Sequence, residues 1–356
     1  MHINKVELHN FRNYENQEIK LKKNINVFYG DNAQGKTNIL EAIFLCAFGK
    51  SFRTTREKEL IKLGEENARI KVEYSKKDRD GNILICISDK KQILVNGVKI
   101  KKLSELLGKI NIVIFTPDDI NILKGTPALR RRFLDMMIGQ LRPNYVYILN
   151  MYNKTLEQRN NYLRQIRQEG KAESLLEIWD EKLVEYGNII SNYRREFINK
   201  IIEEINIIHK KITNDNEKID IIYTSCCENK KNYMDLLTQR RKLDIIKGYT
   251  TKGIHRDDFE VYINDKELSI YGSQGQNRTA VLSLKLSELQ VIHDEIEEEP
   301  ILLLDDFMSE LDIKRRRNFL NNINNTQVII TCAEKINFIN ENVDYYLYQV
   351  KKGEII

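Results

Sequence analysis

Apolar residues recur with two different spacings along the chain, and the spacing separates strand-like from helix-like regions. Residues 3–8 alternate between apolar and polar, and residues 18–21 form a second short strand-like segment. The mainly apolar run 25–29 then ends directly at a glycine. A period of two is typical of half-buried strands. After the glycine-containing loop, residues 38–48 are apolar at helical spacing. We therefore expect short strands and then a helix over the first 48 residues.

Further strands are expected on both sides of the middle of the chain. Asn96-Gly97 separates the apolar residues 93–95 from Val98, and Asn-Gly suits a type I′ hairpin turn. Residues 261–266 have a similar pattern around Asn264-Asp265. Residues 111–115 form another apolar run, which stops before Pro117.

The middle of the chain has the period of amphipathic helices. Apolar residues recur there at steps of three and four in two stretches, which we interpret as two helices separated by a turn at 168–171, where Gly170 lies. The pair is expected to pack antiparallel against the protein's own core, with a partner-binding seam as the alternative, and it is too short for a long coiled-coil arm. The first stretch contains Leu141, Tyr145, Ile148, Tyr152, Leu156, Leu163 and Ile166, and the second Trp179, Leu183, Tyr186, Ile190, Tyr193, Phe197, Ile201, Ile205 and Ile208.

The last third returns to alternating helices and strands. Helices are expected at 281–293 and 316–322, and buried strands at 301–304 and 328–331. The pattern predicts an α/β fold that is split by a helical insertion. We expect a head made of residues 1–125 and 250–356, and a mainly helical lobe made of residues 126–249 that carries the helix pair.

Composition narrows the function only a little. The 356 residues are 41% apolar and carry a formal net charge of +5, which permits a nucleic-acid partner without requiring one. The five cysteines show no zinc-ligand spacing. No apolar run approaches the roughly 20 residues that span a bilayer, and the first ten residues do not resemble a signal peptide. A cytoplasmic protein is the expectation.

The strongest motif is a phosphate-binding loop, which follows an expected strand and precedes an expected helix. Its glycines permit a backbone whose N–H groups point inward at an anion, and the helix adds its positive N-terminal end. Lys36 is expected to reach the β- and γ-phosphates of ATP, and the Thr37 hydroxyl is expected to bind Mg²⁺. The loop residues are Gly30, Asp31, Asn32, Ala33, Gln34, Gly35, Lys36 and Thr37.

Two later segments fit the same nucleotide. The apolar run 301–304 ends at Asp305 and Asp306, of which Asp305 would bind Mg²⁺ and Asp306 would orient or deprotonate the attacking water, as a catalytic residue beside Lys36. A strand that ends in a polar turn is the alternative. Ser273, Gly275 and Gln276 open a helix and could form a second phosphate-binding edge, with a plain helix cap as the alternative.

Together these motifs resemble the RecF family of recombination-repair ATPases, within the ABC/SMC class. The pieces occur in the family's order over most of the chain. Three positions matter for the comparison: Ile254 replaces the family's usual proline, Asn277 replaces a usual glutamine, and Thr331 stands where many ABC ATPases have a switch histidine. The matching segments are Leu8 to Tyr14, Gly30 to Asn38, Pro117-Asp118-Asp119, Lys124 to Pro127, Arg130 to Asp135, His255-Arg256-Asp257-Asp258, Ser273 to Thr279 and Leu303 to Asp312, the last including a D-loop-like Ser309-Glu310-Leu311-Asp312.

The resemblance implies an ABC/SMC-type ATPase head and an ATP-dependent homodimer. Such dimers clamp double-stranded DNA near single-strand gaps, work with RecO and RecR to load recombinase in DNA repair and replication, including the SOS response, and hydrolyse ATP slowly. In an ABC-type dimer the signature at Ser273 meets the nucleotide of the opposite subunit. The resemblance also adds Arg12, Asn13 and Asn38 to the nucleotide site.

The DNA contacts are expected to be sequence-independent contacts with phosphates. Two basic clusters could supply them, Arg130-Arg131-Arg132 and Lys314-Arg315-Arg316-Arg317, although such runs are often only solvated surface. His255 could act as an acid or base, or have a structural hydrogen bond with Asp257 or Asp258.

Other ABC-type functions compete with this interpretation. A nuclease-associated ATPase would need a second cluster of metal ligands, which the sequence does not show. A transporter ATPase would lack the inserted helices, and a structural SMC subunit would need long coiled coils.

Overall fold

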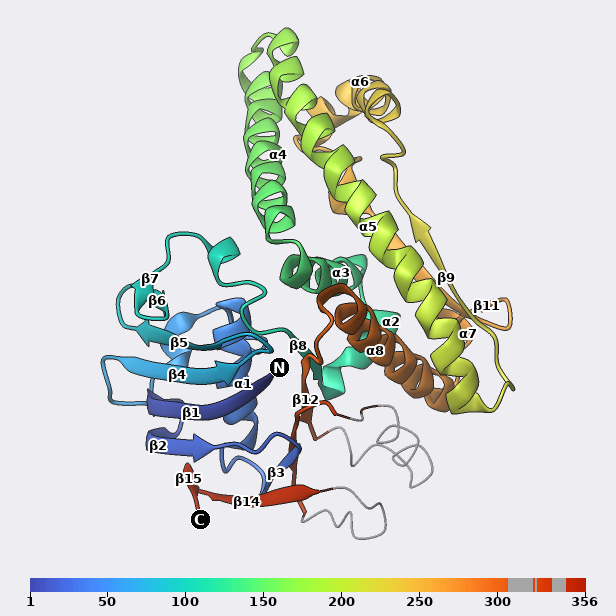
Figure 1. Cartoon of the computed structure of the whole chain (residues 1–356). Helices are drawn as coiled ribbons and strands as arrows, with labels where there is room; N and C mark the ends of the chain where they lie inside the picture. Colours follow the sequence, from blue (N-terminus) through green and yellow to red (C-terminus); the bar gives the residue numbers. More distant parts are fainter. Residues whose placement is uncertain (307–322, 324, 335–343) are drawn as a thin grey trace. The chain divides into compact units, whose positions relative to one another are not determined.

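The computed structural model describes residues 1–306, 323, 325–334 and 344–356 (Figure 1). The chain forms two compact units, residues 1–119 with 288–356, and residues 120–287. The second division falls within helix α8 (Gln274–Ile296). Residues 250–287, which we assigned to the head from the sequence, are part of the second unit. They belong there because strand β10 (Asp258–Ile263) pairs along its whole length with β9 (Ile219–Thr224).

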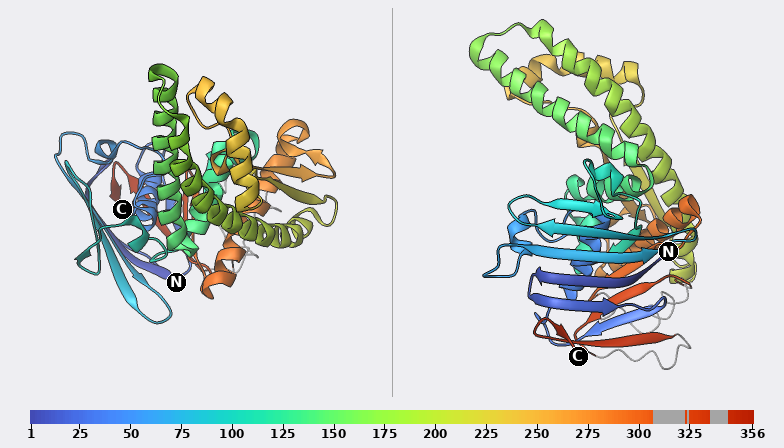
Figure 2. Two further views of the ribbon diagram at one scale, coloured as in Figure 1. Left: turned by 90° about the horizontal axis from the view of Figure 1, so that it is seen from above. Right: turned by 60° about the vertical axis from the view of Figure 1, so that its left-hand side comes forward.

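The first unit contains two six-stranded sheets. One is antiparallel, with the order β2-β1-β4-β5-β6-β7, and its blue and cyan strands lie side by side in the right-hand view of Figure 2. The other has the order β15-β14-β3-β13-β12-β8 and is parallel from β14 to β8. The strands are β1 (His2–Phe11), β2 (Tyr14–Lys20), β3 (Ile25–Tyr29), β4 (Ala68–Ser75), β5 (Asp80–Ile87), β6 (Gln92–Val95), β7 (Val98–Lys99), β8 (Ile112–Phe115), β12 (Ile301–Asp305), β13 (Val328–Cys332), β14 (Tyr345–Lys351) and β15 (Glu354–Ile355).

Helix α1 (Lys36–Phe48) supplies the core of the first unit. It contacts β4 and β5 of one sheet and β12 and β13 of the other. Every residue from Ile39 to Phe48 is buried, as expected for a helix covered on all sides. The helix ends at Gly49, whose φ of 66° closes the last turn by a hydrogen bond to the Leu45 carbonyl.

The parallel strands bring the expected nucleotide-binding segments to one edge. β13 lies between β3 and β12, and its Thr331 is opposite both Phe28 and Asp305. The carboxyl ends of parallel strands meet at the same edge of a sheet, where ligands of open α/β sheets bind. The glycine loop after β3 and the aspartates at the end of β12 are therefore neighbours.

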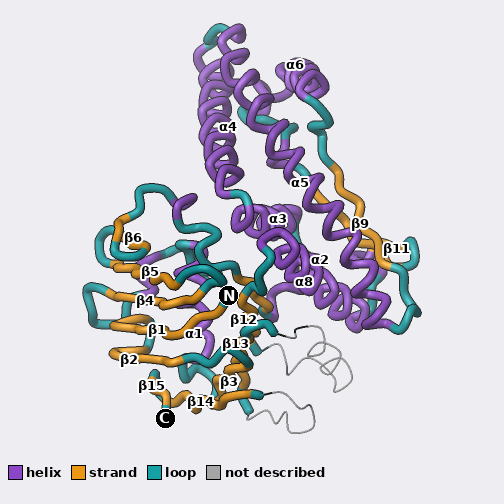
Figure 3. The backbone as a smooth tube through the Cα atoms, viewed as in Figure 1, coloured by secondary structure: helices purple, strands orange, loops and turns teal. Residues whose placement is uncertain are grey.

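The second unit is mainly helical (Figure 3). α4 and α5 pack side by side and are joined across Gly170, which caps α4 with a φ of 66°. The predicted helix pair and its turn are thus confirmed, with 27 residues in α4 and 38 in α5. The unit also contains a small sheet of order β11-β10-β9, which contacts α3, α5 and α7, while α6 packs against α4 and α5. The elements are α2 (Ile120–Lys124), α3 (Pro127–Leu141), α4 (Pro143–Glu169), α5 (Leu176–Thr213), α6 (Lys230–Lys247), β11 (Lys266–Glu267) and α7 (Leu268–Tyr271).

Most strongly patterned segments have the predicted structure. Both predicted hairpins are present, as β6–β7 and β10–β11, and the apolar runs 301–304 and 328–331 are the buried strands β12 and β13. Among the elements that the sequence did not predict are β4, β9, α6, β14 and β15. The helix expected at 316–322, the D-loop-like Ser309–Asp312 segment and the cluster at 314–317 lie outside the described residues. No helix in the described part of the chain is long and apolar enough to cross a membrane.

Candidate nucleotide-binding site

The loop from Gly30 to Thr37 connects β3 to α1 with a backbone suited to anion binding. Gly30, Ala33 and Gly35 have φ values of 151°, 64° and 114°. Left-handed residues within such a loop turn successive N–H groups toward one point. A Cβ atom at Gly30 would lie 2.3 Å from the Val350 carbonyl oxygen, and one at Gly35 would lie 2.6 Å from Asn13 Oδ1. Both positions therefore require glycine.

Lys36 lies over this loop at the start of α1. Its Nζ donates hydrogen bonds to the carbonyl oxygens of Gly30, at 2.6 Å, and Asp31, at 2.9 Å, and its side chain is buried. The ammonium is thus fixed within the concave side of a loop at a helix N-terminus, where two positive electrostatic contributions coincide. Asp31, Asn32 and Ala33 are exposed, so a ligand can reach the loop.

Asp305 at the end of β12 collects hydroxyl groups from its two neighbours. The Thr37 Oγ1 and the Thr331 Oγ1 each donate to Asp305 Oδ1 at 2.7 Å. The two residues predicted as metal ligands, Thr37 and Asp305, are therefore in contact, although 268 residues separate them. Thr331 lies on the neighbouring strand and orients Asp305 through this hydrogen bond. It is the residue that stands where many ABC ATPases have a switch histidine.

Asp306 follows with a left-handed backbone, at a φ of 48°. Its N–H donates to the Thr331 carbonyl oxygen at 3.2 Å and lies 3.1 Å from the Thr331 hydroxyl oxygen. Burial raises the pKa of the Asp306 carboxyl, and the neighbouring Asp305 adds to this, while Lys36 opposes it. A carboxylate with a raised pKa is better able to accept a proton from water.

Arg12 and Asn13 support the loop from the turn between β1 and β2. Asn13 Nδ2 donates to the Gln34 carbonyl oxygen at 2.8 Å, and Asn13 Oδ1 accepts from Asn38 Nδ2 at 2.7 Å. Arg12 donates from Nε and Nη2 to the two carboxylate oxygens of Glu41, at 2.8 and 2.7 Å. The direct nucleotide contacts expected for Arg12 and Asn13 remain predictions.

Glu41 is a residue of this site that the sequence analysis missed. Its carboxylate is fully buried and also accepts hydrogen bonds from Ser51 Oγ at 2.5 Å and Arg53 Nη1 at 3.2 Å. A buried carboxylate must be paired to be tolerated. The available signal was that Glu41 is the one charged residue within the apolar run 39–48.

The signature segment opens α8 in the second unit. The Gln276 N–H donates to Ser273 Oγ at 3.1 Å, and the Ser273 N–H donates to Gln276 Oε1 at 3.0 Å, which is a reciprocal capping box. Gln276 Nε2 also donates to Glu217 Oε1 at 2.9 Å. Asn277 is buried and donates to the carbonyl oxygens of Gly272 and Ser273. Ser273 itself is exposed and Gly275 is half-buried.

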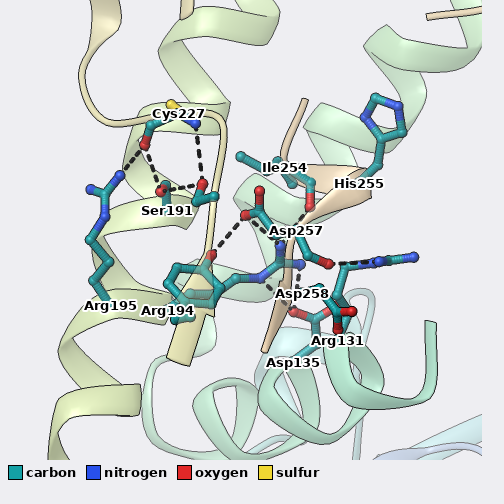
Figure 4. Close-up of polar contacts among 12 residues, drawn as sticks. Arg131, Asp135, Ser191, Arg194, Arg195, Cys227, Ile254, His255, Asp257 and Asp258 are labelled. Carbon is teal, nitrogen blue, oxygen red and sulfur yellow. Dashed lines mark hydrogen bonds and ion pairs between the residues drawn. The ribbon is translucent and has the colours of Figure 1, made fainter. Parts of the chain in front are cut away.

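Asp257 of the His-Arg-Asp-Asp motif lies within a buried polar network (Figure 4). Arg194 Nη1 donates to the Ile254 carbonyl oxygen at 2.7 Å and to Asp257 Oδ2 at 3.2 Å, and its Nη2 donates to Asp135 at 2.9 Å. The Tyr223 hydroxyl donates to Asp257 Oδ2 at 2.7 Å. Since Arg194 and Asp257 are both buried, their pairing links α5 to the start of β10.

His255 has a structural role, with other partners than those expected. Its Nδ1 is 2.8 Å from the Tyr152 hydroxyl and its Nε2 is 3.2 Å from the Thr250 carbonyl oxygen, so it bonds to neither Asp257 nor Asp258. These contacts fit a neutral ring that donates from Nε2 and accepts at Nδ1. Burial lowers the pKa of His255 to about 4.

This pKa predicts an acid-sensitive second unit. Between about pH 6.5 and pH 4 the unfolded chain binds a proton at residue 255 that the folded chain does not, so the free energy of unfolding falls as the pH falls. The loss should reach roughly 2 to 3 kcal/mol at pH 4 and should vanish above pH 7. Denaturant titrations across this range should show a smaller acid loss in His255→Gln than in the wild type. His9→Gln is the control, and an equal effect of both variants would contradict the assignment.

The basic cluster on α3 is largely committed to internal contacts. Arg130 is buried and donates from Nε and Nη2 to the two carboxylate oxygens of Asp258, at 2.6 and 2.8 Å. Arg131 is half-buried and donates to the Asp257 carbonyl oxygen at 2.7 Å (Figure 4). Arg132 is exposed. The DNA contact predicted for Arg130 therefore conflicts with its ion pair. The sequence near Arg130 does not reveal this pair, because its partner Asp258 lies 128 residues further along the chain.

The parallel sheet, the glycine loop and the paired Thr37 and Asp305 define an ATPase head of the ABC/SMC class. Residues 2–355 match the family model described as the RecF/RecN/SMC N terminal domain. The DNA replication and repair protein RecF of Clostridium perfringens is 44% identical, with 100% of this chain and 99% of that protein covered. RecF of Acetivibrio thermocellus is 42% identical, with 98% and 97% covered. The chain therefore belongs to the RecF family of DNA replication and repair proteins.

Solved structures agree with this family assignment. The recombination mediator protein RecF with ATP, described as part of the RecFOR pathway, is 38% identical, with a TM-score of 0.93 over 99% of this chain and 96% of that chain. An Smc head bound to the C-winged helix domain of ScpA is 17% identical, with a TM-score of 0.61 over 100% and 97%. The second likeness extends to the fold alone.

Proposed function

We propose that this protein is an ATP-switched DNA clamp of recombinational repair. Two copies close when ATP bridges the phosphate loop of one and the signature of the other. The closed dimer holds double-stranded DNA near a single-strand gap, and slow hydrolysis releases it. The relative whose structure contains ATP supports nucleotide binding at the matching fold.

One observation carries the dimer proposal: the chain has two segments that could bind phosphate, the phosphate loop in the first unit and the signature at Ser273 in the second. The loop of the first unit holds Lys36 and the pair Thr37–Asp305. In the second unit, exposed Ser273 accepts the Gln276 N–H with its Oγ, so its own hydroxyl hydrogen can donate to an anion. In ABC-type ATPases such a serine meets the nucleotide that the other subunit holds, which requires a head-to-tail dimer.

The donor set of the first half fits Mg²⁺. Thr37 and Asp305 provide hard oxygen atoms that already lie at hydrogen-bond distance from each other. Two protein ligands beside substrate phosphates are typical for this ion, which would neutralise charge on the phosphates. Asp306, next to Asp305, would accept a proton from the attacking water, and Lys36 would stabilise the charge on the transferred phosphate.

DNA and two partner proteins complete the proposal. A related RecF structure is named as a mediator in the RecFOR pathway, so we assign RecO and RecR as partners in recombinase loading, inside the cytoplasm. Contacts with DNA phosphates would make the affinity independent of sequence and sensitive to salt. The role in DNA repair and replication follows the names of the full-length relatives.

Fluorescence anisotropy with a labelled gapped duplex tests this function. The clamp should bind the duplex about tenfold more tightly with ATP than with ADP, because only ATP supplies the γ-phosphate bridge. Affinity should also fall steeply with added salt. Equal affinity in ATP and ADP would contradict the switch. If that binding is also weak, attraction between DNA and exposed basic side chains is enough to explain it, and no clamp is needed.

The α3 cluster predicts two different results from neighbouring arginines. Arg132→Glu should weaken DNA binding several-fold at low salt and leave stability unchanged, since this side chain is exposed. Arg130→Ala should instead cost about 3 kcal/mol of unfolding free energy, because it leaves Asp258 without its buried partner. Anisotropy and denaturant titration separate the two effects. Arg56→Glu reverses an exposed arginine elsewhere, and if it weakens DNA binding as much as Arg132→Glu, α3 is not a DNA contact.

A further inference from the structure

The turn between β14 and β15 contacts the phosphate loop at a single loop residue. The Gly353 N–H donates to the Gln34 carbonyl oxygen at 3.0 Å. The N–H of the preceding Lys352 donates to the Gln34 side-chain Oε1 at 2.7 Å, across 318 residues of sequence. Both the main chain and the side chain of Gln34 are therefore held by this turn.

The same turn packs against Asn13, which lies in the turn between β1 and β2 and also supports the phosphate loop. A Cβ atom at Gly353 would lie 2.3 Å from the Asn13 carbonyl oxygen, so the two backbones touch. Asn13 donates from Nδ2 to the same Gln34 carbonyl oxygen at 2.8 Å. Gln34 is thus the meeting point of three segments from distant parts of the sequence.

The turn between β14 and β15 has the backbone conformation of a tight β-hairpin. Lys352 and Gly353 have φ values of 52° and 79°, which is the left-handed pair of a type I′ hairpin turn. The flanking pairs are Lys351 with Glu354 and Val350 with Ile355. Val350 also contributes the carbonyl oxygen that lies against Gly30, the first glycine of the phosphate loop. The hairpin therefore contacts the loop near its start and near its end.

We infer that the Lys352–Gly353 turn is a positioning element of the nucleotide site. The turn acts through Gln34, whose conformation sets the direction of the neighbouring loop N–H groups. Asp31, Asn32 and Ala33 are exposed, so the loop depends on such outside contacts to keep its anion-binding shape. A preformed loop loses less conformational freedom when phosphate binds. The inference rests on the proposed ATP site.

A matched pair of glycines tests the inference. Gly97 has the same φ of 79° as Gly353 and also lies in a hairpin turn, but a Cβ there would meet nothing within 4 Å. Gly353→Ala and Gly97→Ala therefore add the same backbone strain, and only the first places a Cβ against Asn13, which itself donates a hydrogen bond to Gln34. Titration with a fluorescent methylanthraniloyl-ATP and Mg²⁺, without DNA, should show about a tenfold higher Kd for Gly353→Ala and less than a twofold change for Gly97→Ala.

A second pair and a second readout separate positioning from general stabilisation. Asparagine tolerates left-handed backbone, so Gly353→Asn and Gly97→Asn repeat the comparison with less strain. Unfolding temperatures without nucleotide should show every variant folded at the temperature of the titration, with the Gly353 variants somewhat less stable than their Gly97 counterparts because of the contact with Asn13. The inference is overturned by Kd values that are equal within the pairs once they are corrected for the folded fraction. If the wild type binds ATP but neither dimerises nor closes on DNA, the clamp proposal fails, and the glycine comparison still decides the role of the turn.

Discussion

Lys36→Arg should keep its fold and lose the ATP-dependent dimer. Lys36 Nζ lies 2.6 and 2.9 Å from two loop carbonyl oxygens in a buried position. A guanidinium is planar and wider than an ammonium, so it cannot occupy the same point between these oxygens. Losing one charged contact with the phosphates should weaken the ATP-bound dimer roughly 100-fold. Light scattering with Mg²⁺ and ATP measures this directly.

Lys20→Arg is the control for this substitution, because it makes the same change at an exposed lysine of the first unit. It should dimerise like the wild type. Circular dichroism should show the same helix content in both variants. An unchanged ATP-dependent dimer in Lys36→Arg would remove the phosphate loop from the account of dimerisation.

Asp306→Asn should bind ATP, hydrolyse it about 100-fold more slowly, and keep the dimer closed for longer. The substitution preserves size, and asparagine accepts the left-handed backbone at this position, where φ is 48°. It removes the carboxylate whose raised pKa suits proton transfer from water. In the wild type, hydrolysis should therefore increase with pH as this carboxyl loses its proton, and the variant should lose that dependence. Single-turnover ATPase assays and dimer lifetimes provide the measurements.

Asp265→Asn is a close control, since Asp265 is exposed and also has a left-handed backbone, with φ of 62°. It should hydrolyse ATP at the wild-type rate. If Asp306→Asn fails to bind ATP at all, residue 306 supports nucleotide binding rather than proton transfer. If it hydrolyses ATP normally, another group activates the water.

The sequence predicted those parts of the site whose signal is local. The loop 30–37 combines a strand, two glycines and a helix start within a few residues, and Asp305 ends an apolar run. The helices α4 and α5 have regular apolar spacing over several turns, which tertiary contacts reinforce. In each of these cases the local pattern and the packing favour the same structure.

The remaining parts depend on partners far away in the sequence. β14 has mixed polarity, with Val350 as its buried residue, and it becomes a strand by pairing with β3. Arg130 looks like part of a solvated basic run until Asp258 is placed beside it. Residues 250–287 look like a continuation of the head because β10 is strand-like, whereas β10 pairs with β9 and also contacts α3 and α7 of the second unit.

In the proposed dimer, each nucleotide is shared between the loop of one copy and the signature of the other. Mixing Lys36→Arg with Ser273→Arg tests it most directly, by light scattering with Mg²⁺, ATP and a gapped duplex. Each variant alone should remain monomeric, since every shared site contains one damaged half. The mixture should form dimers, because a heterodimer pairs the intact loop of one variant with the intact signature of the other. A mixture that stays as monomeric as its components would contradict the shared site.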